Sequence, residues 1–435
     1  MLKLARQYYQ ANKDRVHRLS KEGSWVVGGQ IASVMGSLAL VLVLTEYLSL
    51  EQYGQLALGL TVAGLVNQVV MGGLAAGIGR YYSIAAERKD LSGYLRATRY
   101  LLICATALVL AIGLMLMTCL YWLGYGQWIH MAAVALLFAV LSGYNSVLNG
   151  IQNAARQRAI VALHGGLDAW LKIFLALCLM LWLDFSSTVV LIGYACSSML
   201  IIISQIIFLR RTIPLRQTST QLREKWAPQI YSYSFPFTIF GIFTWGQQIS
   251  DRWALQVFAS TSDVGQYAVL FQLGFTPIAL ITGMAVSFLG PVLYQRSGDA
   301  TDQTRNTNVH RISWRIAIFS LFFTLLGSAI TLVLHEWLFG ILVASEFHGN
   351  SHLLPLVILS GGVFAAGQML ALKLLSEMKP SAMTVAKIIT ALTGILLNIT
   401  GAALGGLQGV VWAMLAFSGF YFVWMAILAR RMSTT

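Results

Sequence analysis

The chain contains 435 residues, of which 57% are hydrophobic and 10% are charged, and its mean hydropathy is +0.71. A soluble domain carries about 25% charged residues, so this composition excludes a water-soluble globular protein and indicates that lipid surrounds most of the chain. The formal net charge of +13 does not indicate nucleic-acid binding, because the basic residues lie in short segments between apolar runs.

Twelve apolar runs follow one another along the sequence, and each is long enough to cross a membrane as a helix. Helices are required because a helix satisfies its own backbone hydrogen bonds, and hydrocarbon offers no other partner. We therefore predict an all-α integral membrane protein with about 12 transmembrane helices. The predicted spans are 24–45, 55–79, 100–123, 129–150, 160–183, 186–209, 231–258, 266–290, 312–335, 353–375, 381–404 and 407–429.

The distribution of basic residues predicts the orientation of these spans. Of the 29 lysines and arginines, 25 lie in the two tails or in the loops that follow even-numbered spans. The loops that follow odd-numbered spans instead carry acidic residues, which are Glu46, Glu51, Asp184, Asp263, Glu336 and Glu346. Because cytoplasmic loops are enriched in basic residues, we expect both termini in the cytoplasm.

The longest stretch without a spanning run lies near the middle of the chain and divides six spans from six. It predicts two six-helix lobes joined by a cytoplasmic linker. The predicted organisation is a basic cytoplasmic tail at 1–23, an N-terminal lobe at 24–209, a linker at 210–230, a C-terminal lobe at 231–429 and a cytoplasmic tail at 430–435.

Two local matches indicate that the lobes are parallel repeats. The sequence GQLA at 54–57 opens the second span, and GQYA at 265–268 opens the eighth. The pattern KIxxAL occurs at 172–177 in the fifth span and at 387–392 in the eleventh. Two facing bundles of this kind are a common plan for transporters, with the substrate site at their interface.

Four polar residues lie close together in the seventh span, namely Gln247, Gln248, Asp251 and Arg252. Charged residues within a membrane are costly and usually face a cavity or a partner. Adjacent residues point about 100° apart on a helix, so Asp251 and Arg252 need not pair with each other. We expect two polar stripes that face a cavity, and the alternative is that Arg252 reaches the outer headgroups.

Three lysines also fall within spans. Lys172 follows Asp168 by one helical turn, which is the favourable order for an ion pair, and the pair is either a cavity group or an internally neutralised structural pair. Lys387 has no acid within one turn along the sequence, so we expect it to face the cavity, with a position at the headgroups as the alternative. Lys373 and Glu377 are interpreted as a structural ion pair.

Asn67 and Gln68 in the second span form a further candidate for the cavity wall, beside the alternative of hydrogen bonding between helices. Hydrogen bonding between helices is the expected role of the remaining intramembrane amides. These are Gln30, Asn145, Asn149, Gln272, Gln368 and Asn398.

Two segments carry a resemblance to a known family. LTEYLSLEQYGQLALGLTVAGLVNQVVMGGLAAGIGRYYS at 44–83 and SDRWALQVFASTSDVGQYAVLFQLG at 250–274 resemble the Wzx-type oligosaccharide flippases. These form the polysaccharide-transporter branch of the multidrug/oligosaccharidyl-lipid/polysaccharide exporter (MOP) superfamily. The resemblance implies two six-helix lobes around a central cavity. It also implies that Asp251 and Arg252 match an Asp-Arg pair that is common in the family's seventh span.

The function implied by this resemblance is transport of an undecaprenyl-pyrophosphate-linked oligosaccharide, an O-antigen or exopolysaccharide repeat unit. The substrate would move from the cytoplasmic to the periplasmic leaflet of a bacterial inner membrane by alternating access. Such a carrier needs cations for the pyrophosphate and amides or hydroxyls for the sugars. Its implied partners are the lipid-linked oligosaccharide, membrane lipids, and a polysaccharide polymerase and chain-length regulator, with no nucleic acid.

Two other functions remain open. A drug/cation antiporter of the same superfamily predicts a cavity dominated by acids, whereas the spans hold three acids and four bases. A membrane polysaccharide polymerase or acyltransferase predicts a large outer loop or a His/Asp constellation within the membrane, and the sequence has neither. No glycine is followed by lysine, so the sequence has no phosphate loop for ATP, and we expect no cofactor.

Overall fold

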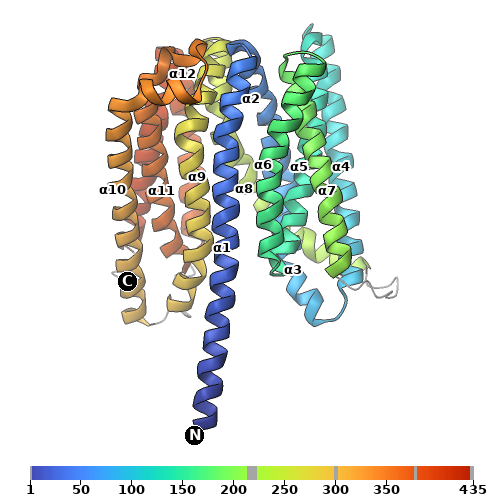
Figure 1. Ribbon diagram of the computed structural model, residues 1–435, viewed down its shortest axis with the longest axis vertical. Coiled ribbons are helices and arrows are strands. Elements are labelled where there is room, and N and C mark those ends of the chain that lie inside the picture. Colours follow the sequence, from blue (N-terminus) through green and yellow to red (C-terminus); the bar gives the residue numbers. More distant parts are fainter. Residues whose placement is uncertain (1, 213–222, 298–301, 377–379, 432–435) are drawn as a thin grey trace.

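The computed structural model describes residues 2–212, 223–297, 302–376 and 380–431. Within these ranges the chain is almost entirely helical and has no strand. The helices run side by side as a bundle, with the N-terminal and C-terminal groups of helices on opposite sides of α1 and α8 (Figure 1). The prediction of an all-α membrane protein is confirmed.

The first half of the chain forms six spans. The second of them is one long rod in which α2 continues through a short π-helix, η1, into α3. The elements are α1 (Leu2–Tyr47), α2 (Leu50–Leu65), η1 (Val66–Met71), α3 (Gly72–Glu87), α4 (Leu91–Trp122), the 3-10 turn η2 (Gly126–Trp128), α5 (Ile129–Ala154), α6 (Arg158–Trp182) and α7 (Ser187–Thr212).

The second half also forms six spans, because α12 contains two of them. Gly405 and Gly406 interrupt this helix, and Gly406 has a positive φ of 54°, which a residue with a side chain rarely adopts. The chain reverses there and crosses the membrane again. The elements are α8 (Arg223–Phe258), α9 (Thr261–Ser297), α10 (Gln303–Leu342), the 3-10 segment η4 (Ser345–Leu353), α11 (Leu354–Ser376) and α12 (Pro380–Arg431).

Length and hydropathy alone identify 10 candidate spans within the described residues. The reversal inside α12 adds an eleventh, and α8 is the twelfth. α8 corresponds to the predicted span at 231–258.

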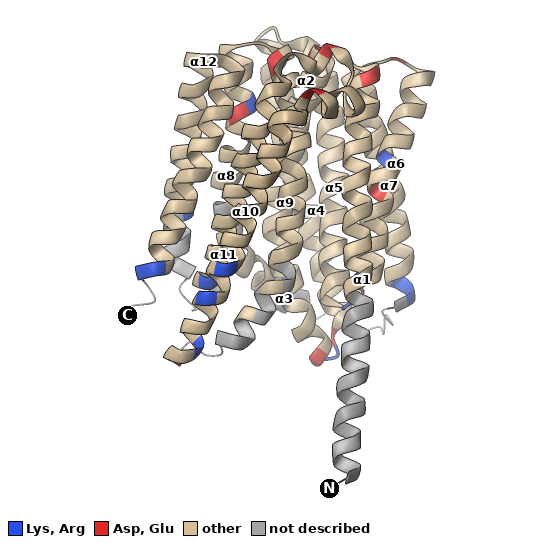
Figure 2. Ribbon diagram, turned by 60° about the vertical axis from the view of Figure 1, so that its left-hand side comes forward, with Lys and Arg blue, Asp and Glu red and all other residues tan. Residues whose placement is uncertain are grey.

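The basic residues gather at one end of the bundle, and this is the end at which α1 begins and α12 ends (Figure 2). Most acidic residues lie at the opposite end. This separation agrees with the predicted topology, in which the end that carries the termini faces the cytoplasm. We call this end inner and the opposite end outer.

Several helices extend beyond the apolar runs from which they were predicted. α4 begins at Leu91, so Arg96 and Arg99 lie on a helix rather than in a loop. Its start is fixed by Asp90, whose carboxylate accepts a hydrogen bond from the Gly93 amide at 3.1 Å. α8 begins at Arg223, inside the predicted linker. Hydropathy locates only the part of a helix that lies in hydrocarbon, whereas capping locates its end.

The two halves meet closely at the outer ends of α2 and α9. A β-carbon on Gly54 would lie 2.0 Å from the carbonyl oxygen of Thr261, and one on Gly265 would lie 2.1 Å from that of Leu50. These are the two glycines that open the predicted repeat. Only glycine permits this approach of two backbones, which is a common use of small residues between membrane helices.

α8 packs against both halves. Near its inner end it lies against α3, where a β-carbon on Gly73 would meet Thr238 at 2.3 Å and one on Gly77 would meet Ser234 at 2.2 Å. Near its outer end it packs along α12, and Asn398 donates a hydrogen bond to the Ser250 hydroxyl at 2.8 Å. α8 therefore connects the two lobes rather than belonging to the C-terminal lobe alone.

Candidate functional site

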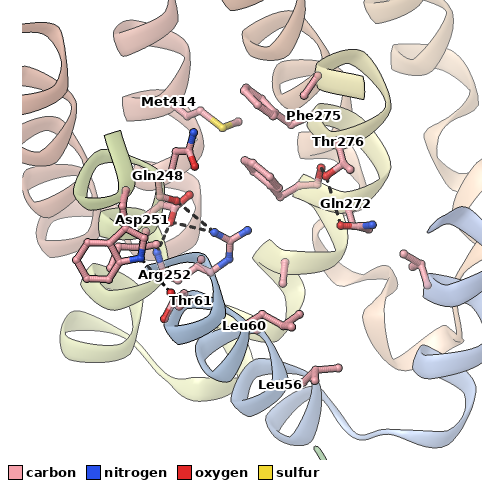
Figure 3. Close-up of a pocket in the computed structure, with 18 of the residues that line it drawn as sticks. Leu56, Leu60, Thr61, Gln248, Asp251, Arg252, Gln272, Phe275, Thr276 and Met414 are labelled. Carbon is pink, nitrogen blue, oxygen red and sulfur yellow. Dashed lines mark hydrogen bonds and ion pairs between the residues drawn. The ribbon is translucent and has the colours of Figure 1, made fainter. Parts of the chain in front are cut away.

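A cavity of about 650 Å³ lies between the two halves of the bundle. Residues of α1, α2, η1, α5, α6 and α7 form one side, and residues of α8, α9, α11 and α12 form the other. Tyr53 and Leu56 line it next to Gly54, so the contact between α2 and α9 lies at its outer end. The predicted central cavity between two lobes is present, and Figure 3 shows part of its wall.

The structure brings the four polar residues of α8 together in this wall, since Gln247, Gln248, Asp251 and Arg252 all line the cavity. Asp251 and Arg252 contact each other, with 3.6 Å between Asp251 Oδ1 and Arg252 Nη1. The sequence argument that neighbours on a helix need not pair underestimated the reach of arginine. Its side chain folds back along the helix, and Nη1 also donates to the Gln248 carbonyl oxygen at 3.3 Å (Figure 3).

Asp251 also lines the cavity, and both of its carboxylate oxygens accept hydrogen bonds. Only 5% of this residue is exposed, and Oδ2 accepts a hydrogen bond of 2.6 Å from the Tyr267 hydroxyl. Oδ1 accepts a second bond of 2.6 Å from the Arg252 amide. The Arg252 guanidinium carbon lies 4.8 Å from the centroid of the Phe271 ring, a favourable cation–π distance. The acid and the ring together fix the guanidinium at the cavity wall.

Gln68 joins the two halves across the cavity. It lies on the π-helix η1, and its amide donates to the Gln248 side-chain oxygen at 2.5 Å. Asn67, its neighbour and fellow candidate, is not among the lining residues. The Asn67 amide instead donates to the Ser142 hydroxyl on α5 at 2.7 Å, so this residue fulfils the alternative of hydrogen bonding between helices.

Lys172 and Asp168 form the expected ion pair, with 2.5 Å between Nζ and Oδ2. Lys172 lines the cavity, whereas Asp168 does not and is tied to α7 by a 3.0 Å hydrogen bond from the Ser197 hydroxyl. The Lys172 ammonium lies 5.5 Å from the Phe138 ring centroid and 5.9 Å from that of Tyr194. In this pair the cation lines the cavity and the acid does not.

The other two intramembrane lysines lie elsewhere. Lys387 is half-buried near the first residues of α12 and is not among the residues that line the cavity. Lys373 is fully buried and donates to the carbonyl oxygen of Ala429 at 2.5 Å, near the end of α12. Its proposed partner Glu377 lies outside the described residues. The Lys373 ammonium thus joins α11 to α12, and its predicted ion pair with Glu377 stays a prediction.

Sequence reasoning did not identify the aromatic part of the wall. Nothing distinguishes these residues in the sequence, because aromatic side chains within spans usually face lipid or pack in the core. The lining aromatics are Tyr53, Phe138, Tyr194, Trp245, Phe271, Phe275, Phe364 and Phe417. Gln272 and Asn398, for which hydrogen bonding between helices was expected, also line the cavity.

The wall therefore combines aromatic faces, several amides and two cations that are each paired with an acid. Rings and amides are suited to bind the apolar and hydroxyl-bearing faces of sugars, and the cations are suited to bind a phosphate. Within the described residues, no three histidine, cysteine, aspartate or glutamate side chains are grouped to hold a metal ion.

The sequence model of a family described as "Polysaccharide biosynthesis protein" matches residues 19–296. The chain belongs to this family. A search of curated proteins gives no match.

Solved structures show the same fold at low sequence identity. The lipid II flippase MurJ in an inward closed conformation has 14% identity and a TM-score of 0.72, over 94% of this chain and 87% of that chain. An inward-facing multidrug resistance MATE family transporter of the MOP superfamily has 13% identity and a TM-score of 0.65, over 93% and 96% of the two chains. The MATE transporter VcmN of Vibrio cholerae in its bent form has 15% identity and a TM-score of 0.58, over 95% and 98%. The neighbours of this protein are thus transporters and flippases of the MOP superfamily.

Proposed function

We propose that this protein is a flippase that moves an undecaprenyl-pyrophosphate-linked oligosaccharide from the cytoplasmic to the periplasmic leaflet of a bacterial inner membrane. The oligosaccharide would be the repeat unit of an O-antigen or exopolysaccharide. The observation that supports this substrate most directly is the wall of the cavity between the halves. Two cations, Arg252 and Lys172, line the cavity; their acidic partners are Asp251, which is only 5% exposed, and Asp168, which is not among the lining residues.

This arrangement favours an anionic substrate over a cationic drug. A cationic drug is best bound by an exposed carboxylate, but Asp251 is only 5% exposed and already accepts hydrogen bonds from Tyr267 and Arg252. Arg252 still has donors that Asp251 and Gln248 leave unoccupied, because a guanidinium carries five. A pyrophosphate could accept hydrogen bonds from this group in the bidentate manner that arginine favours.

The side-chain amides of the cavity could hydrogen-bond the sugar portion of the substrate. Gln68, Gln247, Gln248, Gln272 and Asn398 all line the cavity, and each side-chain amide both donates and accepts. The rings of Phe271 and Phe275 stack on each other with centroids 4.7 Å apart, giving the same wall an extended apolar face. A sugar presents hydroxyls at its rim and C–H groups on its faces, so it can use both kinds of surface.

The way in which the halves are joined is compatible with alternating access. The close contact of Gly54 with Thr261, and of Gly265 with Leu50, holds the outer ends of α2 and α9 together. Release of the substrate on the outer side requires this contact to open, by rocking of one bundle against the other. The hydrogen bond from Gln68 to Gln248 also joins the halves, and a substrate in the cavity would compete for it.

The test is deletion of the gene in its own host, followed by analysis of the surface polysaccharide and the undecaprenyl-pyrophosphate-linked pool. We expect loss of the polymer and accumulation of one repeat unit on the cytoplasmic side. Complementation with the wild type should restore export, and complementation with Arg252→Ala at an equal protein level should not.

Two results would contradict the proposal. An unchanged glycan together with a new sensitivity to cationic drugs would identify a drug/cation antiporter instead. Repeat units that reach the outer leaflet but stay unpolymerised or unmodified would identify an enzyme. Membrane vesicles separate these cases, because access of an added glycosidase reports the leaflet in which the repeat unit lies.

A further inference from the structure

A second cavity, of about 880 Å³, lies on the lipid-facing side of the first half, near its inner end. It is a groove between α4 and α7, with part of α5 as its floor. It has no residue in common with the central cavity. Ile103 on one wall is 53% exposed and Ile206 on the other is 36% exposed, so the groove opens toward the surrounding lipid.

Three arginines lie at the inner mouth of this groove. Arg96 and Arg99 come from the first turns of α4, and Arg210 comes from the last turn of α7. All three are exposed. Because they project from two helices on opposite walls, a single anionic group in the mouth could contact both walls. Arginine is the residue best suited to bind a phosphate through two parallel hydrogen bonds.

Toward the membrane centre the groove is apolar. Its walls there are Leu102 and Ile103 on α4, Leu148 on α5, and Ile202 and Ile206 on α7. The groove thus runs from a cationic mouth at the membrane surface to an apolar body in the hydrocarbon. A phospholipid has the same order of groups, with a charged phosphate above acyl chains.

The packing of α4 explains why the groove is open. In its outer half α4 lies close to α5, because Gly113 sits against Leu136 and the Thr106 and Tyr144 hydroxyls are 2.8 Å apart. Near its inner end α4 turns toward other partners. The Tyr94 hydroxyl donates to the carbonyl oxygen of Ile78 on α3 at 2.7 Å.

A second bond holds the inner end of α4 in the same direction. Trp226 on α8 donates from its ring nitrogen to the Asp90 carboxylate at 2.7 Å. Asp90 is the N-cap of α4, so this bond draws the start of the helix toward α8. The inner end of α4 is therefore held on the side away from α7, and the groove occupies the space between them.

The corresponding place in the second half is built differently. There α10 is the third span and the last part of α12 is the sixth, and they carry Arg311, Arg315 and Arg430. The Arg430 guanidinium carbon lies 5.1 Å from the Trp314 ring centroid, so this arginine already contacts a protein side chain. The second half thus provides arginines in the same leaflet that serve as a matched comparison.

We propose that the groove between α4 and α7 binds an anionic glycerophospholipid of the inner leaflet. Its phosphate contacts Arg99 and Arg210, with Arg96 beside them, and its acyl chains lie along Ile103, Ile202 and Ile206. The bound lipid fills the space between α4 and α7 and supports the inner end of α4. Binding therefore raises the thermal stability of the protein.

The test is native mass spectrometry of the full chain in detergent with phosphatidylglycerol or phosphatidylethanolamine of identical acyl chains. We expect the wild type to retain phosphatidylglycerol preferentially. Arg99→Gln/Arg210→Gln should weaken this binding roughly 25-fold, since one arginine near the surface contributes about fivefold. Arg311→Gln/Arg315→Gln removes the same charge from the same leaflet and should leave the binding unchanged.

A second variant separates the groove from its charge. Ile206→Trp fills the apolar body and keeps every arginine, so it should abolish the preferential retention of phosphatidylglycerol while the protein elutes as a single folded species. Equal loss in the two double variants would mean that a general basic belt attracts the lipid, and the proposal would be wrong. Wild-type binding by Ile206→Trp would likewise overturn it. Stronger retention of undecaprenyl phosphate than of phosphatidylglycerol would assign the groove to a polyprenyl lipid instead.

Discussion

Gly54 on α2 and Gly265 on α9 hold equivalent positions in the two halves, and each lies against the helix that carries the other. The charged groups of the cavity have no such equivalence. In the first half Lys172 pairs with Asp168 one turn before it on α6. In the second half Arg252 pairs with its neighbour Asp251 on α8, and Lys387, the match of Lys172 in the repeat, is not a lining residue.

This difference between the glycines and the charged groups reflects two separate requirements, one for contact between the halves and one for binding the substrate. In the proposed transport cycle the contact between the halves forms and breaks as a unit, and two like surfaces give it twofold regularity. The proposed substrate has a pyrophosphate at one end and sugars at the other, and a symmetric wall would not fit it. We infer that packing kept the repeat while the polar groups of the cavity diverged.

The largest effect on export and stability should come from the Asp251–Arg252 pair, which has no equivalent in the first half. In Arg252→Ala, the buried Asp251 carboxylate loses its cation, and breaking a buried pair costs about 3 kcal/mol. We expect loss of surface glycan together with a lower thermal unfolding midpoint in detergent. Arg252→Lys keeps the charge but loses the planar fork, so export should be intermediate.

A double variant distinguishes structure from transport. Asp251→Asn/Arg252→Gln removes both charges and keeps both side chains polar, so the unfolding midpoint should return toward that of the wild type. Export should still be absent, because the cavity lacks its guanidinium. Recovery of export in this variant would show that the pair has only a structural role.

The next effect concerns Lys373, another charge that belongs to the second half alone. Its ammonium is fully buried and donates to the Ala429 carbonyl oxygen. Lys373→Met keeps the length of the side chain but leaves this buried contact unmade, which costs about 1–3 kcal/mol. We expect a lower unfolding midpoint and less protein in the membrane, with normal export per molecule. Wild-type stability combined with lost export would instead place Lys373 on the transport path.

Lys373 also shows what the sequence could not provide. The number of spans and their order could be read from hydropathy and charge, because lipid acts on each helix separately. A residue four positions along the same helix is equally easy to find, so the pair with Glu377 was proposed. The partner that the structure shows, Ala429, is 56 residues away, and only the packing of α11 on α12 brings it near.

The site illustrates the same limit. Polar residues within a span are conspicuous, so Gln68, Lys172 and Arg252 were predicted for the cavity and line it. Periodicity could not separate Gln68 from Asn67, since the π-helix η1 changes the direction of side chains where they lie. The aromatic wall gave no signal, because in a membrane span an aromatic residue in a cavity looks like one in lipid.

A smaller effect is expected at the symmetric contact. Gly54→Leu and Gly265→Leu each place a side chain against a backbone carbonyl and should destabilise the closed outer end by about 1–3 kcal/mol. The two variants should reduce export equally, and the double variant should be little worse than either. In a cysteine-free background with Tyr53→Cys, labelling by an impermeant maleimide should rise.

The control for this prediction is Gly340→Leu, because a β-carbon on Gly340 would meet nothing within 4 Å. It adds the same side chain near the outer end of α10 and should change neither export nor labelling. Unequal effects of Gly54→Leu and Gly265→Leu would mean that the regularity of the contact does not extend to its energetics.

The smallest effect should be that of Lys172→Ala. Asp168 is less buried than Asp251, with 24% of its side chain exposed, and it keeps its hydrogen bond from Ser197 when the lysine is removed. An ion pair of this helical spacing contributes about 0.5 kcal/mol, so the unfolding midpoint should barely change. Export should fall, but less than in Arg252→Ala, because an ammonium offers a point charge where the guanidinium offers a fork. Surface glycan measured at equal protein levels tests this order. If Lys172→Ala abolished export while Arg252→Ala retained it, the pyrophosphate would belong to the first half, and the contrast between the two ion pairs would be reversed.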